Sequence, residues 1–212
     1  SVEKDVTDML GKYNSFFTGS PSKKDIYLTF DNGYENGYTP KILDVLKRKK
    51  VPATFFVTGH YLSSSPNIVK RMVKEGHIVG NHSWNHPDFT VISEARLRGE
   101  LEKVRLKTEE LTGQKKMLFL RPPQGVFSER TLSISKQLGY RNVFWSVAFV
   151  DWNINNQKGW KYAYDQITKQ IHPGAVLLLH AVSKDNAEAM DKVIDDLRQK
   201  GYTFKSLNAL SK

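Results

Sequence analysis

Residues 25–50, DIYLTFDNGYENGYTPKILDVLKRKK, contain a strand, a polar loop and a helix in that order. The run 25–31 is rich in apolar residues, which indicates a buried strand. Residues 39–50 have apolar positions at helical spacing and a proline near the first turn, which predicts an amphipathic helix. The strand ends in Asp31 and Asn32, and a carboxylate followed by an amide at such a position is typical of the edge of an active site.

The same alternation continues along the chain and predicts one α/β domain of about seven strands. Near-continuous apolar strands separated by helices are typical of parallel strands that are buried on both faces. No strand is followed by G-x-G-x-x-G or G-K-[ST], which favours an irregular (β/α) barrel over an open doubly wound sheet. We expect residues 1–24 to form an N-terminal helix and arm packed on a domain of residues 25–212. Strands are predicted at 25–31, 53–59, 77–83, 117–123, 141–147, 175–180 and 202–207, and helices at 39–50, 65–76, 93–113, 128–140, 159–171 and 186–201.

Composition narrows the chemistry and the partners. The 212 residues include no cysteine, so any metal must be bound by His, carboxylate, amide or water. The net charge of +10 fits either solvated helix faces or an anionic partner. Because no nucleic-acid motif accompanies this charge, we do not expect a nucleic-acid partner. We expect the protein to be a monomer. No apolar run could span a bilayer, and the polar segment after Ser1 predicts that any signal peptide lies outside this sequence.

Polar side chains stand at the ends of five predicted strands, where a (β/α) barrel builds its active site. The two histidines of HSWNH have an i, i+4 spacing, which suits a divalent ion such as Zn²⁺, Co²⁺ or Ni²⁺. A buried Arg121 needs a carboxylate partner, and Asp151 is the best candidate. His180 leaves a buried strand, and on its own a satisfied core histidine would be the simpler interpretation. The strand ends carry Asp31, His82 with His86, Arg121, Asp151 and His180.

Together these residue types indicate metal-assisted hydrolysis. A metal would polarise a carbonyl and its bound water, a carboxylate would take the proton of the water, and a histidine would protonate the leaving nitrogen. The sequence has no G-x-S-x-G motif, which argues against a serine hydrolase.

The motifs TFDNG (29–33), HSWNH (82–86), RPPQG (121–125), DW (151–152) and LLLH (177–180) resemble, in order and spacing, those of a known family. It is the polysaccharide deacetylases of carbohydrate esterase family 4, which share the NodB-homology domain. The resemblance covers about residues 25–207 and is strongest to the sporulation-type peptidoglycan N-acetylmuramic acid deacetylases. It implies a distorted, incomplete (β/α) barrel with an open groove for a linear glycan.

The resemblance also implies catalytic roles. Asp31 matches the catalytic base, and Arg121 matches the arginine that orients this base. His180 matches the catalytic acid, and Asp151 matches the residue that tethers the arginine or tunes the catalytic histidine. The backbone N–H of Gln124 matches the donor that stabilises the oxyanion.

Further residues match the metal site and the walls of the groove. His82 and His86 match two metal ligands, and Asn32 stands where the family usually has the third, an aspartate. The aromatic rings of Tyr34 and Trp84 could stack on sugar rings. Trp152 and Leu178 match the walls of the pocket for the acetyl methyl group.

Two departures from the family pattern concern acidic residues. Asn32 replaces the usual aspartate, and Ala148 stands where many members carry an acid. An amide in place of a carboxylate removes one negative charge, which predicts weaker binding of a divalent ion. The ion could be held by the two histidines with Asn32 or with water, or Asp31 could move onto it. Alternatively, the amide could serve an anionic substrate, which a carboxylate would repel.

The resemblance implies a secreted enzyme that acts on peptidoglycan glycan strands in the cell wall or in the space between the forespore membranes. The expected reaction is removal of the N-acetyl group of N-acetylmuramic acid, with release of acetate, as a step toward muramic δ-lactam in spore cortex. The alternatives are a deacetylase of N-acetylglucosamine or chitin, and a catalytically impaired glycan-binding relative.

Overall fold

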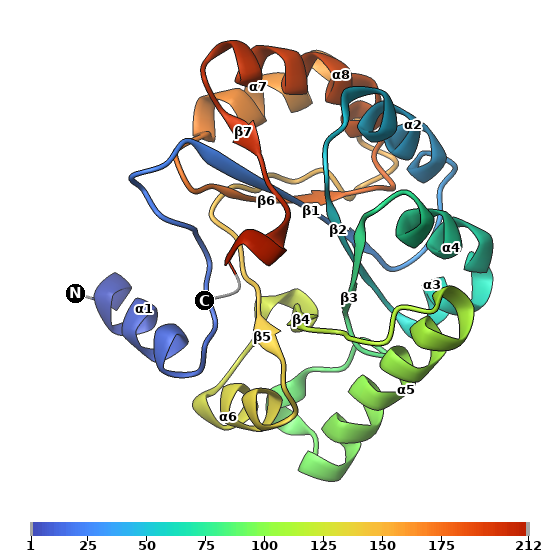
Figure 1. Cartoon of the computed structure of the whole chain (residues 1–212), viewed down its shortest axis with the longest axis vertical. Coiled ribbons are helices and arrows are strands. Elements are labelled where there is room, and N and C mark those ends of the chain that lie inside the picture. Colours follow the sequence, from blue (N-terminus) through green and yellow to red (C-terminus); the bar gives the residue numbers. More distant parts are fainter. Residues whose placement is uncertain (1, 211–212) are drawn as a thin grey trace.

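The computed structural model describes residues 2–210, whose strands form one parallel sheet that curls into an incomplete barrel (Figure 1). The strand order is β5-β4-β3-β2-β1-β6, and β7 pairs with the beginning of β1. The predicted (β/α) barrel with about seven strands is therefore confirmed. The strands are β1 (Asp25–Asn32), β2 (Thr54–Val57), β3 (Ile78–Asn81), β4 (Phe119–Leu120), β5 (Arg141–Asn142), β6 (Val176–His180) and β7 (Thr203–Phe204).

Helices surround the sheet on its outer side (Figure 1). Their starts follow local signals in the sequence: Ser93 and Ser183 each accept a hydrogen bond from a backbone N–H of the first turn, and Ser128 forms a capping box with Thr131. The helices are α1 (Val2–Lys12), α2 (Thr39–Lys49), α3 (Gly59–Ser64), α4 (Pro66–Lys74), α5 (Glu94–Thr112), α6 (Glu129–Gln137), α7 (Trp160–Gln170) and α8 (Lys184–Gln199), with 3-10 turns η1 (Phe89–Val91), η2 (Pro123–Gly125) and η3 (Leu207–Leu210).

The two edges of the incomplete barrel approach each other beyond the end of β5. Strands β5 and β6 are not neighbours in the sheet, but Val147, beyond the end of β5, forms an isolated parallel bridge with Leu177 of β6. Between the sheet and its helices, apolar side chains fill the core, and Phe30 of β1 stacks on Phe55 of β2 with ring centroids 5.1 Å apart. A stiff, filled core holds the strand ends in fixed relative positions.

The N-terminal segment contacts the barrel at its β5 side. Leu10 of α1 packs in a small apolar cluster with Leu132 and Phe144, and Phe16 forms a parallel bridge with Val143. The predicted segment 1–24 begins at residue 1 and the predicted domain 25–212 ends at residues 211–212, and these three residues lie outside the described part of the chain. The division between the two stays a prediction.

Several predicted strands are shorter in the structure, those at 117–123, 141–147 and 202–207 being reduced to two residues each, and one helix was not predicted. The predicted strand 117–123 shrinks to the two residues of β4, because Pro122 and Pro123 lack the N–H groups that a strand pair requires. The predicted strand 141–147 shrinks to β5. The additional helix, α3, has only six residues, which is too short for a periodic pattern; Thr58 caps it by accepting a hydrogen bond from the Tyr61 N–H.

Candidate active site

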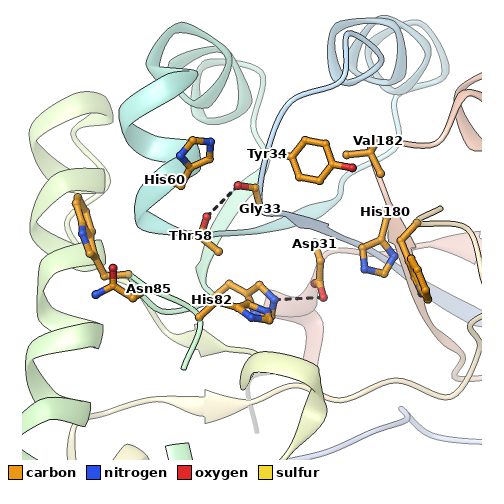
Figure 2. A pocket seen from close by; sticks show the side chains of 12 residues that line it. Asp31, Gly33, Tyr34, Thr58, His60, His82, Asn85, His180 and Val182 are labelled. Carbon is orange, nitrogen blue, oxygen red and sulfur yellow. Dashed lines mark hydrogen bonds and ion pairs between the residues drawn. The ribbon is translucent and has the colours of Figure 1, made fainter. Parts of the chain in front are cut away.

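The parallel register brings the predicted site residues to one edge of the barrel. Asp31, near the end of β1, lies directly opposite His180 at the end of β6. Strands β3 and β4 pair through their last residues, so His82 and Arg121, which follow them, lie next to each other. Figure 2 shows Asp31 between His82 and His180 at the centre of one pocket.

Two connected hollows meet at this point, with volumes of about 410 Å³ and about 500 Å³. The first extends past Tyr34 and Trp84, and the second past Gln124 and Leu178. Together they form a groove on both sides of the central residues, which fits an extended substrate. The residues that line both hollows are Asp31, His82, His86, Trp152 and His180.

Arg121 is completely buried, and its carboxylate partner is Asp31. The Arg121 Nη1 donates to Asp31 Oδ1 at 2.9 Å, while the other guanidinium nitrogens donate to the backbone oxygens of Val143, at 2.9 Å, and Phe144, at 3.1 Å. The prediction that Asp151 would pair with Arg121 was therefore wrong. The parallel register places Arg121 at the end of β4 within reach of β1, and these three hydrogen bonds fix the orientation of the Asp31 carboxylate.

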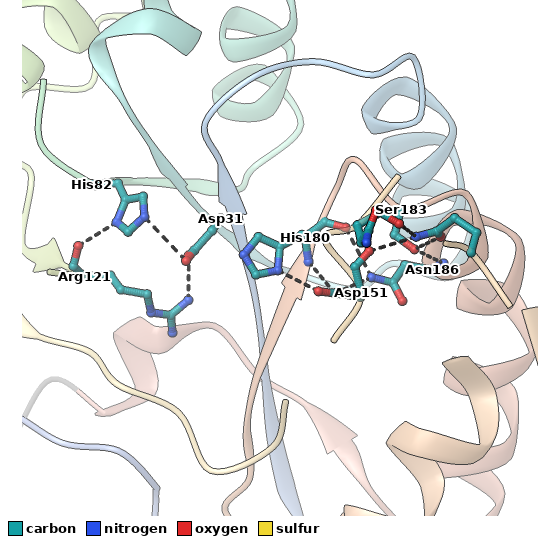
Figure 3. A network of polar contacts seen from close by, with 9 residues as sticks. Asp31, His82, Arg121, Asp151, His180, Ser183 and Asn186 are labelled. Carbon is teal, nitrogen blue, oxygen red and sulfur yellow. Dashed lines mark hydrogen bonds and ion pairs between the residues drawn. The ribbon is translucent and has the colours of Figure 1, made fainter. Parts of the chain in front are cut away.

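Asp151 pairs instead with His180 (Figure 3). Its Oδ1 lies 2.7 Å from His180 Nδ1, and its Oδ2 accepts hydrogen bonds from the His180 N–H at 2.8 Å and from Asn186 Nδ2 at 2.7 Å. The Nδ1 of His180 is thus occupied, which leaves Nε2 as the nitrogen available to a substrate. Sequence reasoning missed Asn186, because nothing in the α8 sequence marks it as a contact of a residue 35 positions earlier.

The charges of the site move the pKa values of Asp31 and His180 in opposite directions. Burial alone would raise the pKa of Asp31, but the nearby His82, Arg121 and His180 lower it below its ordinary value. Burial alone would lower the pKa of His180, but the hydrogen bond and the charge of Asp151 raise it above its ordinary value. The site therefore favours an ionised carboxylate beside a protonated imidazole, the combination that a base and an acid require.

The two histidines of the second motif fit a divalent ion. His82 Nδ1 lies 2.7 Å from the backbone oxygen of Arg121, and because a carbonyl can only accept, Nδ1 carries the proton. Its Nε2 then has a free lone pair on the side of Asp31, whose Oδ2 lies 3.6 Å away. The His86 ring lies edge-on to that of His82, with centroids 4.9 Å apart. Burial lowers the pKa of both imidazoles, which favours their neutral, metal-binding form.

Asn32 is the one predicted metal ligand that lies outside the lining of the groove. Its side chain is 1% exposed, and its Nδ2 donates to the hydroxyl of Thr39 at 3.3 Å. Among residues 2–210, its Oδ1 has no hydrogen-bond partner, and no group of three or more His, Asp or Glu residues is close enough to hold an ion. The two imidazoles and a buried amide oxygen without a partner are thus the donor set that fits a metal here.

A buried glutamate, Glu100, holds the loop that carries His86. Its two carboxylate oxygens accept hydrogen bonds from the backbone N–H and the side-chain amide of Asn85, at 2.9 and 2.8 Å. The hydroxyl of Ser83 accepts the His86 N–H at 2.9 Å, and His86 adopts a φ of 57°. Such a conformation in a residue other than glycine persists only where the surroundings hold it. Glu100 was not predicted, because it reads as an ordinary charged position of a long helix.

The remaining predicted residues lie on the walls of the groove. Gln124 adopts a φ of 57° directly after two prolines, and such strained backbone is common at functional sites. Leu178 is 7% exposed and lies beside Trp152, which is 55% exposed. Tyr34 and Trp84 both line the first hollow.

Comparison with known proteins identifies the family. The family model described as polysaccharide deacetylase matches residues 18–143. The chain belongs to the polysaccharide deacetylase family. It has the fold of a family 4 carbohydrate esterase, as the motif resemblance predicted. Within residues 2–210, no helix is both long enough and apolar enough to cross a membrane.

Two relatives, one of them also compared as a solved structure, show which members of the family this chain resembles. It is 58% identical to the peptidoglycan-N-acetylmuramic acid deacetylase PdaA of Bacillus subtilis, over 98% of this chain and 79% of the relative. The structure of Bacillus subtilis PdaA, a family 4 carbohydrate esterase, superposes with a TM-score of 0.96 at 57% identity, over 98% of this chain and 88% of that chain. A peptidoglycan-N-acetylglucosamine deacetylase of Bacillus cereus is 37% identical, over 94% of this chain and 72% of the relative.

Proposed function

We propose that this chain hydrolyses the N-acetyl group of N-acetylmuramic acid residues in peptidoglycan and releases acetate. The observation that carries the proposal is the position of Asp31 directly opposite His180 in one groove, where the surrounding charges lower the pKa of Asp31 and raise that of His180. The 58% identity to an enzyme named for this reaction supports it, because the identity to the relative named for N-acetylglucosamine is only 37%.

In this mechanism Asp31 is the base and His180 is the acid. The Asp31 carboxylate, oriented by Arg121, takes a proton from water as the water oxygen attacks the acetyl carbonyl. When the bond between the carbonyl carbon and nitrogen breaks, His180 Nε2–H gives its proton to the leaving nitrogen. Asp151 stabilises the protonated imidazole until that transfer.

The walls of the groove position the acetyl group. The backbone N–H of Gln124 donates to the oxyanion that forms at the carbonyl, while Leu178 and Trp152 enclose the methyl group. On the other side of the centre, Tyr34 and Trp84 offer ring faces to neighbouring sugars.

A divalent ion such as Zn²⁺, Co²⁺, Ni²⁺ or Mn²⁺ would be held by His82, His86 and Asn32. When bound, it would polarise the acetyl carbonyl and lower the pKa of water in the site. Because the third ligand is a neutral amide rather than a carboxylate, the ion would be held more weakly than by two imidazoles and a carboxylate.

The charge of the groove favours an anionic sugar. Among the residues that line the two hollows, Asp31 is the only carboxylate, and Arg121 balances it. Asn32 and Ala148 occupy two positions where an acid would add negative charge. The lactyl carboxylate that distinguishes muramic acid from glucosamine would therefore meet little repulsion.

We also propose where the reaction takes place. The similarity to PdaA supports action outside the cytoplasm, on the cell wall or between the forespore membranes, as a step toward muramic δ-lactam in spore cortex. A monomer with a net charge of +10 suits an anionic wall polymer as its partner.

The test is mass spectrometry of muropeptides after incubation of glycan strands with the protein, with and without a chelator. We expect acetate release and muramic residues that have lost their acetyl group, and we expect the chelator to reduce both. Asp31→Asn should abolish release while binding to the strands persists. Loss of acetyl from glucosamine instead would support the alternative substrate, and strand binding without any acetate release would indicate an impaired relative.

A further inference from the structure

The buried amide of Asn32 belongs to a hydrogen-bond network that no motif of the family predicts. Its Nδ2 donates to Thr39 Oγ1, and Thr39, at the start of α2, is completely buried. The neighbours of Asn32 in the chain, Asp31 and Gly33, both line the groove, whereas Asn32 itself lines neither hollow. Whether the Thr39 hydroxyl donates a hydrogen bond to the amide or accepts one from it depends on the other partners of this hydroxyl.

The Thr39 hydroxyl has two other side-chain partners, the carboxylate of Glu35 and, at 3.4 Å, the hydroxyl of Tyr61. Thr39 Oγ1 donates to Glu35 Oε1 at 2.5 Å, and the hydroxyl of Tyr61 donates to the same oxygen at 2.8 Å. The backbone N–H groups of Gly37 and Thr39 donate to Glu35 Oε2 at 2.8 and 3.3 Å. The carboxylate of Glu35 thus accepts four hydrogen bonds.

The network determines which end of the amide is free. A hydroxyl has one proton, and that of Thr39 is committed to an ionised carboxylate, so Thr39 Oγ1 can only accept from Asn32. The amide must therefore turn its nitrogen to Thr39. Its oxygen is then left buried and without a hydrogen-bond partner among residues 2–210. An amide that faced the ion with its N–H₂ group could not bind a cation.

We propose that Glu35 and Thr39 are positioning residues that hold the Asn32 amide with its oxygen toward the metal. The proposal rests on the proposed function of the same site, and it explains how an amide at position 32 can act as a metal ligand. A carboxylate has two equivalent oxygens and needs no such control, whereas an amide binds a cation only in one of its two orientations. The loop 33–38 supplies that control through Glu35.

Glu35→Gln should reverse the amide. The two backbone N–H groups can only donate, so the oxygen of the new side chain must face them, and its N–H₂ group must face Thr39 and Tyr61. Thr39 then accepts from position 35, and its proton turns toward Asn32, which must present its oxygen. Zn²⁺ affinity, measured by titration calorimetry, should fall about 10- to 100-fold, the range seen when a contact that orients a ligand is lost.

Making the same substitution in a second variant distinguishes a loss of amide orientation from general damage to the site. In Asn32→Asp protein, Glu35→Gln should leave Zn²⁺ affinity unchanged within about threefold, because either carboxylate oxygen can bind the ion. An equal loss of affinity in both backgrounds would overturn the proposal, and so would no loss in either.

Thr39→Val offers an independent test with a matched control. It removes the hydroxyl that orients Asn32 and should lower Zn²⁺ affinity about 10-fold or more. Thr54→Val makes the same change at another buried threonine, whose hydroxyl has no partner among residues 2–210, and should leave the affinity unchanged. Equal affinities for the two variants would refute the role of Thr39. Because calorimetry needs no glycan, a failure here is distinguishable from a failure to release acetate.

Discussion

Asp151→Asn tests whether a carboxylate keeps His180 protonated. In the structure, Asp151 Oδ2 accepts from two fixed donors, the His180 N–H and Asn186 Nδ2, while Oδ1 faces His180 Nδ1. In the variant, the amide oxygen must take the place of Oδ2, because the two donors need an acceptor. The N–H₂ group then faces Nδ1, where it opposes the proton of a charged imidazole.

The expected effect follows from the lost contact. A hydrogen bond to a charged group is worth about 1.5–3 kcal/mol, and about 1.4 kcal/mol corresponds to a tenfold change in a population. The pKa of His180, which Asp151 raises, should therefore fall, and the protonated fraction above that pKa should drop about 10- to 100-fold. Because the acid acts only when protonated, the rate in alkaline solution falls by the same factor, and the high-pH limb moves to lower pH.

The assay is acetate release as a function of pH for both proteins. Asp185→Asn is the matched control: this carboxylate is also buried, lies beside Asn186 in α8 and accepts the backbone N–H groups of Lys158 and Gly159, but does not contact His180. It should lower stability without moving the limb. If the high-pH limb stays in place in Asp151→Asn, or moves equally in the control, the reasoning is refuted.

Unfolding gives a second measure of the same pair. The pKa of His180 is higher in the folded protein than its ordinary value, so the pair stabilises the fold below that ordinary value and loses this contribution as the pH rises through the folded pKa. The loss of stability in Asp151→Asn should thus be greater in acidic than in alkaline solution. A loss independent of pH would mean that the charge of His180 is not involved.

Three other changes test the remaining parts of the site. Arg121→Lys keeps the charge but leaves buried acceptors without donors; the free energy of unfolding should fall by at least about 2 kcal/mol, and kcat should fall because Asp31 loses its orientation. A Cβ at Gly59 would lie 2.2 Å from Trp84 Cδ2, so Gly59→Ala should displace this ring and raise KM for glycan strands more than it lowers kcat. Gly99→Ala, where a Cβ meets nothing within 4 Å, should leave both constants unchanged and stabilise α5 by about 0.5–1 kcal/mol. Binding to isolated peptidoglycan should weaken as ionic strength rises, given the net charge of +10; a sedimentation assay in which salt had no effect would exclude this charge from recognition.

The fold was predictable because its signals are local. Apolar runs of strand length alternate with amphipathic helices, and Ser93, Ser128 and Ser183 cap helices close to where their positions in the sequence indicate. The predicted lengths of β4 and β5 were wrong, since these two strands pair with each other over only two residues. Parallel strands also place every strand end at one edge, so the location of the site follows from the fold class alone.

Residue types alone do not decide the partners within the site, because these depend on distances between strands; the family resemblance implied that Arg121 orients Asp31 but left open whether Asp151 contacts the arginine or the histidine. From sequence, Arg121 could pair with Asp31 or with Asp151, and nothing local distinguishes the two. The strand order decides, because it places β1 between β2 and β6 and brings Asp31 into register with His180. Asn186 and Glu100 were missed for the same reason: each acts on a residue of a distant loop through one buried hydrogen-bond group.

The choice of partner for Arg121 is also what allows a base and an acid to coexist in one groove. If Arg121 paired with Asp151, His180 would lose the negative charge that raises its pKa, and Asp31 would lose a positive charge that lowers its own. The remaining charges would then oppose burial less strongly, which would shift the two groups toward a neutral carboxylic acid and a neutral imidazole. Two separate pairs, Arg121 with Asp31 and His180 with Asp151, overcome burial at both positions. The barrel thus fixes the protonation states by giving each group a different partner of opposite charge.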